Sequence, residues 1–108
     1  MGVTDTATDN VHVASLAGEI DHTTGDTLGQ ALAVPGTPPP RIVADMCQDT
    51  FIDSSGINIL IAAHYALTSA GGWLRLAGVT TPVMRTIGIV GLGSVIDCYE
   101  TLSKALED

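Results

Sequence analysis

The residues best suited to chemistry lie in one short segment, Phe-Ile-Asp-Ser-Ser-Gly-Ile at positions 51–57. Asp53, Ser54 and Ser55 stand directly before an apolar pattern of helical period, which predicts a helix N-terminus at this point. The first N–H groups of a helix are unpaired and carry partial positive charge, so this position favours anions. A serine there either caps the helix or presents its hydroxyl to another molecule, and capping needs only one of the three residues. Gly56 favours the second role, because a residue without a side chain leaves room beside Ser54 for another protein's active site.

A catalytic serine is the competing interpretation of Ser54. Such a serine needs a general base and donors for an oxyanion, and the segment lacks the Gly-x-Ser-x-Gly pattern of hydrolases. The candidate bases are His12, His22 and His64. His64 falls on the apolar face of the predicted helix, which indicates a core or interface histidine, whereas His22 stays open as a base. The charge of Asp53 would disfavour an alkoxide beside it.

Cofactor and metal sites are not indicated by any spacing. There is no P-loop, and no cluster of His, Cys and carboxylates has metal-ligand spacing. Asp21 and Asp53 could hold Mg²⁺ together with a phosphate, but they are far apart in sequence, and surface acids are the simpler interpretation. Three glycines at 88, 91 and 93 follow a predicted helix, the order expected of a helix end and the reverse of a dinucleotide-binding motif. We expect neither a metal nor a cofactor.

Strands alternate with helices along the chain. We expect strands at 11–17, 41–46, 73–77 and 95–99, a turn or short strand at 18–21, and helices at about 23–34, 55–70, 81–90 and 101–107. Alternation of this kind predicts an α/β protein with a largely parallel sheet. The expected core is formed by apolar residues of these elements: Ile42, Val43, Leu60, Ile61, Leu74, Leu76 and Ile87.

Length and charge restrict the function further. With 108 residues, the chain is expected to form one domain at 10–108, after a loose, polar arm at 1–9. Twelve acids against four bases give a net charge of −8, which disfavours binding to nucleic acid or anionic lipid. No apolar run is long enough to span a membrane, and the first residues lack a signal-peptide pattern, so a cytoplasmic protein is expected.

Several segments together resemble the STAS-domain family of anti-sigma-factor antagonists. Positions 51–57 closely match the phosphoacceptor motif of that family. Four further segments match in order and spacing, so that the resemblance covers about residues 11–107: Gly18-Glu19-Ile20-Asp21, Ile42-Val43-Ala44-Asp45, Gly71 to Ala77, and Thr81 to Leu92. The resemblance implies the STAS fold, a mixed but mostly parallel sheet of about four to five strands with about four helices.

The resemblance also implies a function. Ser54 matches the serine that a kinase phosphorylates, and the residues around it would contact the partner: Asp21, Asp53, Ser54, Ser55, Gly56 and Asn58. Asn58 replaces the small residue that many members have. The unphosphorylated protein would bind an anti-sigma factor, often itself a serine kinase, and so release a sigma factor for transcription. Phosphorylation would end binding, and a phosphatase would reset the serine. The alternatives are an interaction scaffold that is never phosphorylated, a STAS module that binds a small ligand, and an enzyme that uses Ser54.

Overall fold

The computed structural model describes residues 2–8, 11–20, 25–32 and 41–107. Its sheet has five strands in the order β1-β2-β3-β4-β5, in which β1 and β2 are antiparallel and all other neighbours are parallel. The strands are β1 (Gly2–Thr8), β2 (Val11–Ile20), β3 (Arg41–Ile52), β4 (Trp73–Ala77) and β5 (Asp97–Tyr99). The helices are α1 (Gly25–Ala31), α2 (Ser54–Ser69), α3 (Thr81–Val90) and α4 (Leu102–Glu107), with a short 3-10 helix at Leu92–Ser94. The predicted α/β class with a mixed, mostly parallel sheet is confirmed.

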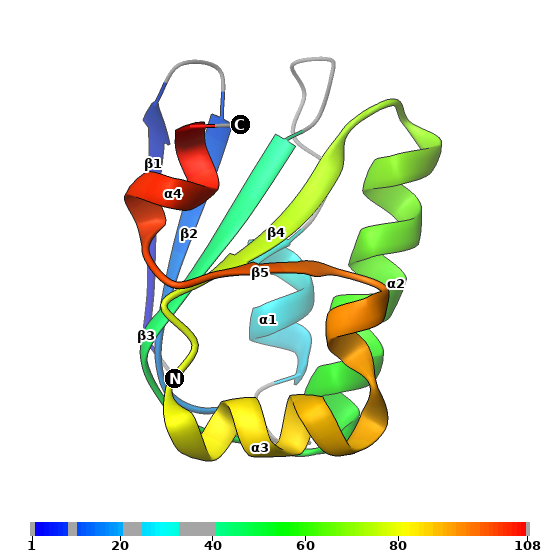
Figure 1. The fold of residues 1–108 in the computed structure, drawn as a ribbon. Helices are drawn as coiled ribbons and strands as arrows, with labels where there is room; N and C mark the ends of the chain where they lie inside the picture. Colours follow the sequence, from blue (N-terminus) through cyan, green and yellow to red (C-terminus); the bar gives the residue numbers. More distant parts are fainter. Residues whose placement is uncertain (1, 9–10, 21–24, 33–40, 108) are drawn as a thin grey trace.

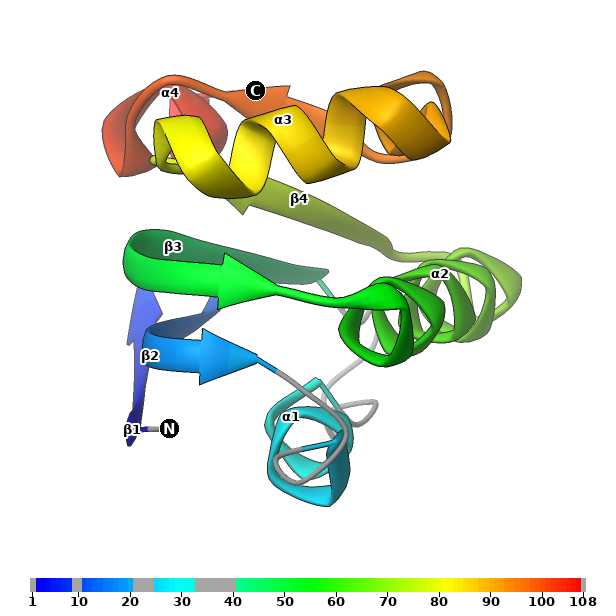
Figure 2. The ribbon, with the colours of Figure 1, turned by 90° about the horizontal axis from the view of Figure 1, so that it is seen from below.

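The helices cover the sheet unequally. Figures 1 and 2 show α1 and α2 on one face of the sheet, α4 on the other face, and α3 across the ends of the strands. The larger core cluster lies on the α1 and α2 side, where alternate residues of the strands, such as Ile42 and Leu76, meet Leu60 of α2. A second cluster lies under α4, where Val43 and Ala77 meet Ala105. Because successive side chains of a strand point to opposite faces of the sheet, β3 and β4 each contribute residues to both clusters.

Six of the seven core residues expected from the sequence are confirmed. Ile42, Val43, Leu60, Leu74, Leu76 and Ile87 are all buried, as expected from the sequence. Ile61 is an exception, because its side chain is only half-buried at the border of the larger cluster.

The N-terminal residues differ from the prediction. Gly2–Thr8 form an edge strand that pairs with β2 along its whole length, from Gly2 opposite Ala17 to Thr8 opposite Val11, so the expected loose arm is wrong for these residues. This segment is largely polar and has few apolar side chains to bury, so its place in the sheet depends on backbone hydrogen bonds to β2. β-branched residues, Val3, Thr4, Thr6 and Thr8, were the signal for a strand.

Several element ends also differ. β2 continues past Gly18, which has a φ of +92°, to Ile20, and β3 continues past the predicted end at Met46 to Ile52. The helix expected at 55–70 begins at Ser54 and ends at Ser69. The sequence predicts Thr81 as the N-cap of the third helix, but Thr80 takes that position. It also predicts a cap at Thr23 or Thr24 and a proline loop at 35–40, which lie outside the described residues.

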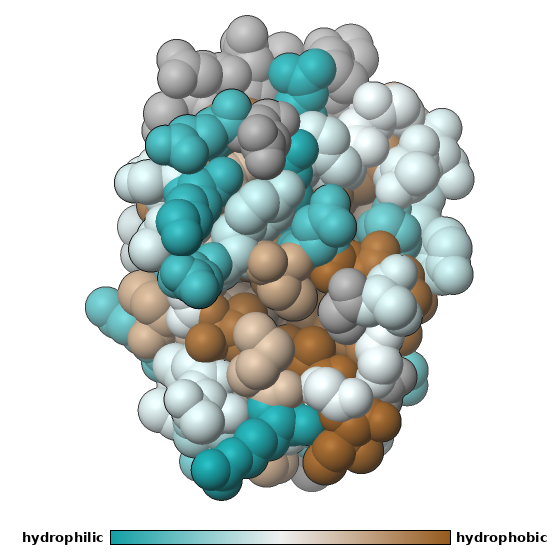
Figure 3. Space-filling model, in the orientation of Figure 1, coloured by the Kyte–Doolittle hydropathy of each residue, from teal (hydrophilic) through white to brown (hydrophobic). Residues whose placement is uncertain are grey.

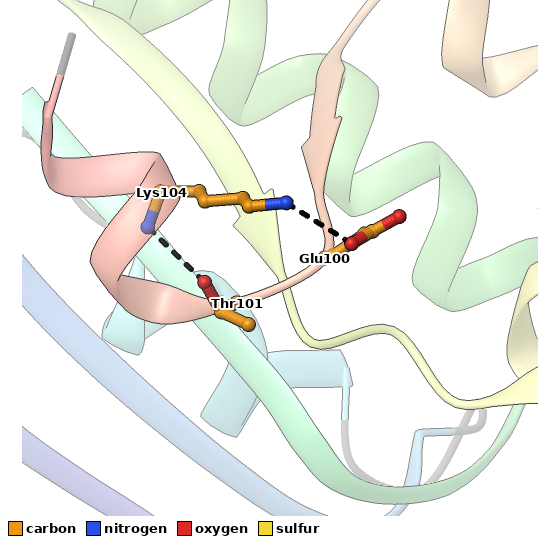
Figure 4. Close-up of polar contacts among 3 residues, drawn as sticks. All are labelled: Glu100, Thr101 and Lys104. Carbon is orange, nitrogen blue, oxygen red and sulfur yellow. Dashed lines mark hydrogen bonds and ion pairs between the residues drawn. The ribbon is translucent and has the colours of Figure 1, made fainter.

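The last helix is fixed by local contacts. The Lys104 backbone N–H donates to Thr101 Oγ1 at 3.2 Å, and the Lys104 ammonium pairs with Glu100 at 3.1 Å (Figure 4). Arg75 of β4 stacks on Trp73, with its guanidinium carbon 3.9 Å from the ring centroid, and donates to the carbonyl of Ala105 at 2.9 Å. These contacts hold α4 on its face of the sheet.

The surface is polar over α4 and apolar near the C-terminal end of α3 (Figure 3). Figure 3 shows hydrophilic residues gathered over α4 and a hydrophobic area near the C-terminal end of α3. Ile89 of α3 is 86% exposed. No helix among the described residues is long and apolar enough to cross a membrane.

Candidate functional site

Asp53 organises the junction between β3 and α2. It is the N-cap of α2, and its carboxylate accepts a hydrogen bond from the Gly56 N–H at 3.2 Å. Its own N–H donates to the carbonyl of Ile20 at 3.1 Å, and its carbonyl accepts from Ile57 at 3.1 Å. Asp53 therefore satisfies the start of the helix and ties it to the end of β2.

Both serines are free of the capping role, because Asp53 fills it. Ser54 is the first residue of α2 and is exposed, whereas Ser55 is half-buried. Ser54 was expected just ahead of the helix, and the structure corrects this by one residue. Neither hydroxyl makes a hydrogen bond to another described residue. An exposed hydroxyl on the first turn of a helix with 16 residues is well placed to carry an anion, since the partial positive charge of the N-terminus is strongest there.

Gly56 has a different role from the one expected. It is buried, and a Cβ at this position would lie 2.6 Å from Cγ2 of Ile20 and 2.8 Å from Cγ1 of Ile52. The absent side chain makes room for the protein's own sheet, not for another protein's active site. Asn58 is exposed on the next turn, as a contact residue must be, and Asp21 lies outside the described residues.

The surroundings of Ser54 combine negative charge with an apolar side chain. Glu19 is exposed at the end of β2 and lies opposite Phe51 in the strand register. Phe51, three positions before Ser54, is 47% exposed. Phe51 therefore offers a partner an apolar contact close to the acids Glu19 and Asp53.

The described histidines lie too far from Ser54 to act as its base. His64 follows Ser54 by ten positions on the same helix, which corresponds to about 15 Å along the axis. His12 stands near the start of β2 and contacts Asp5 of β1 at 3.3 Å, at the other end of the strand from Ile20. His22, the base left open by the sequence, lies outside the described residues.

Asp49 of β3 is an unexpected feature close to the site. It is fully buried, and neither carboxyl oxygen has a hydrogen-bond partner in the described part of the chain. Burial, and then the charge of Asp45, raise the pKa of Asp49 to about 7. The sequence did not indicate the burial of Asp49, because Asp49 stands in a polar run after Met46, where the strand was expected to end.

One cavity bears on the small-ligand alternative. It has a volume of about 260 Å³ and lies between β1, β2 and β3, away from the start of α2. Its lining is mainly polar or small: Thr4, Ser15, Leu16, Ala17, Asp45, Cys47 and Gln48. Ligand pockets usually have about 300–1,000 Å³ and a largely apolar lining, so this cavity gives the alternative little support.

Comparison with known proteins gives a consistent result. The model of the STAS domain family matches residues 3–105. The anti-sigma F factor antagonist of Paenibacillus polymyxa is 27% identical over 100 residues, covering 91% of this chain and 86% of the relative. The crystal structure of an anti-sigma factor antagonist from Mycobacterium paratuberculosis is 32% identical, with a TM-score of 0.86 over 97% of this chain and 90% of that one.

A further neighbour is known in two chemical forms. The Bacillus cell fate determinant SpoIIAA in its phosphorylated form has a TM-score of 0.71 at 19% identity, covering 98% of this chain and 97% of its own. Its unphosphorylated form has a TM-score of 0.76 at 21% identity, over 98% and 94% of the two chains. At this level of identity the likeness concerns the fold alone.

Proposed function

Because the chain belongs to the STAS-domain family of anti-sigma-factor antagonists, we propose that it binds an anti-sigma factor when Ser54 is unmodified and is released when Ser54 is phosphorylated. The anti-sigma factor would be a serine kinase, and a phosphatase would restore the hydroxyl. The outcome would be regulation of sigma-factor-dependent transcription in the bacterial cytoplasm.

The observation that carries this proposal is the exposed, uncommitted Ser54 hydroxyl on a preformed helix N-terminus. Asp53 already caps the helix, so Ser54 can be modified without loss of the cap. The partial positive charge of the helix start offsets part of the phosphate charge, and the fold need not change.

The effect of phosphorylation on binding follows from charge. A phosphoserine adds about −1.5 to −2 charges at neutral pH. These charges would stand beside Asp53 and near the acidic end of β2 at Glu19. A partner surface that fits a neutral hydroxyl would meet the bulk of the phosphate. It would also have to bury the phosphate charge beside Asp53, and like charges brought together at an interface cost several kcal/mol.

In the proposed mechanism this chain is the substrate of the kinase and needs no cofactor of its own. ATP, Mg²⁺ and the base that accepts the serine proton would belong to the kinase. Asp53, Ser54, Ser55 and Asn58 would contact the partner, and Phe51 adds the exposed apolar side chain beside them. Gly56 would act indirectly, because the absence of a side chain lets the start of α2 pack closely against Ile20 and Ile52.

Kinase treatment of three proteins tests the proposal. The wild type, Ser54→Ala and Ser55→Ala are each incubated with ATP and an anti-sigma kinase from the same genome, and their intact masses are measured. We expect one phosphate on the wild type and on Ser55→Ala, and none on Ser54→Ala. Peptide mass spectrometry then locates the phosphate.

Three outcomes would contradict the assignment. Phosphate on Ser55 or on a threonine, with Ser54→Ala modified normally, would remove Ser54 from the mechanism. Stable binding to the kinase without any phosphate transfer would favour the scaffold that is never phosphorylated. Covalent labelling of Ser54 by a serine-directed reagent would favour the enzyme alternative.

A further inference from the structure

Asp49 is the one polar or charged side chain that is fully buried among the described residues. A buried carboxylate without a partner is costly, whereas a neutral carboxylic acid in the same place costs much less. Neither carboxyl oxygen of Asp49 has a hydrogen-bond partner among residues 2–8, 11–20, 25–32 and 41–107. The fold is therefore compatible with the protonated form of Asp49 and conflicts with the ionised form.

The neighbouring charges increase this conflict. Asp45 on the same strand is the charged group that acts on Asp49, and Asp49 in turn contributes to the raised pKa of the Cys47 thiol. On β2, Glu19 follows Gly18, the residue opposite Asp49. Of these groups, Asp45 disfavours a negative charge on Asp49.

Among the described residues, the charged group that acts on Asp49 is the acid Asp45, and the cations on the elements packed against β3 are engaged elsewhere or exposed. On β4, Arg75 stacks on Trp73 and bonds to α4, and on α4 itself Lys104 pairs with Glu100. Arg85 of α3 is exposed, and the acid at the start of α2, Asp53, is engaged with Gly56.

Asp49 also holds the start of α3. The Thr80 hydroxyl donates to the main-chain carbonyl of Asp49 at 2.9 Å. Thr80 is the N-cap of α3, yet its side chain makes no capping hydrogen bond. An ionised carboxylate would compete with the adjacent carbonyl for this hydroxyl and for water, because a charged acceptor forms the stronger hydrogen bond.

We propose that Asp49 is a proton switch: it is neutral in the folded protein, and its ionisation releases the start of α3 from β3. The same strand continues through Ile52 to Asp53, whose N–H is bonded to Ile20, so release also loosens the strand end that carries Ser54. Weaker partner binding at higher pH would follow, and this consequence alone rests on the proposed function.

The sign of the pH effect follows from the raised pKa. The folded protein holds a proton on Asp49 up to about pH 7, whereas the unfolded chain loses it near pH 3.8. Because the folded state binds more protons in this interval, stability falls as pH rises through it and levels off above pH 7.

Denaturant unfolding at several pH values tests the switch. Trp73, the single tryptophan, reports unfolding of the wild type, of Asp49→Asn and of the control Asp45→Asn at pH 5, 7 and 8. Relative to Asp49→Asn, the folding constant of the wild type should fall about 50-fold from pH 5 to 7 and about twofold more by pH 8. Asp45→Asn should retain a steep fall. Parallel curves for the wild type and Asp49→Asn would overturn the proposal.

Two measurements keep the test decisive if Asp49→Asn does not fold. Asp49→Leu replaces the acid by an apolar residue and should show the same loss of pH dependence. A carbon NMR titration of the wild-type Asp49 carboxyl should have its midpoint near pH 7, and a midpoint near pH 4 would overturn the proposal.

Hydrogen exchange tests the release of α3. The Met84 N–H donates to the Thr80 carbonyl at 2.8 Å at the first turn of α3. After correction for the intrinsic exchange rate, its protection should decrease between pH 6 and 8 in the wild type and stay constant in Asp49→Asn. Constant protection in both would refute the release. The measurements use the unphosphorylated chain without partner, and Ser54→Ala should behave as the wild type, so they are independent of the role of Ser54.

Discussion

Gly56 packs so closely on Ile20 that a Cβ at position 56 would lie 2.6 Å from Cγ2 of Ile20. Ile20 is the last residue of β2, and its carbonyl accepts the hydrogen bond of the Asp53 N–H. The start of α2 is thus fixed to the sheet by a backbone hydrogen bond and by the absence of one side chain. Ser54 has its position because of both.

Gly56→Ala should destabilise the protein, although alanine usually favours a helix. The new methyl group would overlap Ile20 and Ile52, and relief of such overpacking costs about 1–3 kcal/mol. Gly88→Ala on α3 is the matched control, since a Cβ there meets nothing within 4 Å. The control should gain up to about 1 kcal/mol in denaturant unfolding. Equal effects of the two substitutions would show that position 56 is not tightly packed.

Asp53→Ala should lose the cap of α2. Removing an N-cap side chain costs about 1 kcal/mol, and Asp53→Asn should lose much less because its amide oxygen can still accept from Gly56. Thermal unfolding of the three proteins at one pH measures the difference. Unchanged stability of Asp53→Ala would mean that another group takes over the cap.

Leu60 and Ile61 should respond differently to truncation. Leu60 is fully buried, so Leu60→Ala should cost about 2–5 kcal/mol. Ile61 is half-buried, and Ile61→Ala should cost clearly less than Leu60→Ala. The midpoints of urea unfolding give the comparison. A larger loss for Ile61→Ala would mean that the packing of α2 is misplaced.

Ser54→Asp should bind the anti-sigma partner more weakly than Ser54→Ala. The alanine methyl group removes the hydroxyl without adding charge, whereas the carboxylate adds one charge beside Asp53 and only partly imitates a phosphate. Titration calorimetry with the purified kinase measures both affinities. Equal affinities would contradict the electrostatic explanation of release.

Arg75→Lys should loosen α4. Lysine keeps the charge but loses the planar group that stacks on Trp73 and reaches the Ala105 carbonyl, and we expect a loss of about 1 kcal/mol. Lys104→Gln is the control, because its ion pair with Glu100 is exposed and contributes less than about 0.5 kcal/mol. Faster hydrogen exchange confined to α4 in Arg75→Lys would confirm the role.

The order of residues along the chain was enough to predict the fold class, six residues of the core and the segment of the candidate site. Strands of period two and helices of period 3.6 leave their pattern in the chain, so the strand Trp73–Ala77 was predicted at its true ends and the start of the helix Thr81–Val90 to within one residue. The segment around Ser54 was identified because capping residues, serines and a glycine stand together before an apolar helix.

Only the tertiary structure decided the roles that depend on residues distant in sequence. Gly2–Thr8 form a strand because β2 offers hydrogen bonds to pair with, and no local pattern reports such a partner. Gly56 serves internal packing because Ile20, at the end of β2, lies against this position of α2. Asp49 is buried because the sheet and the start of α3 enclose it, although its polarity indicated a surface position. Burial and close packing depend on neighbours from the whole chain, so they cannot be predicted from the residues next to a position in the sequence.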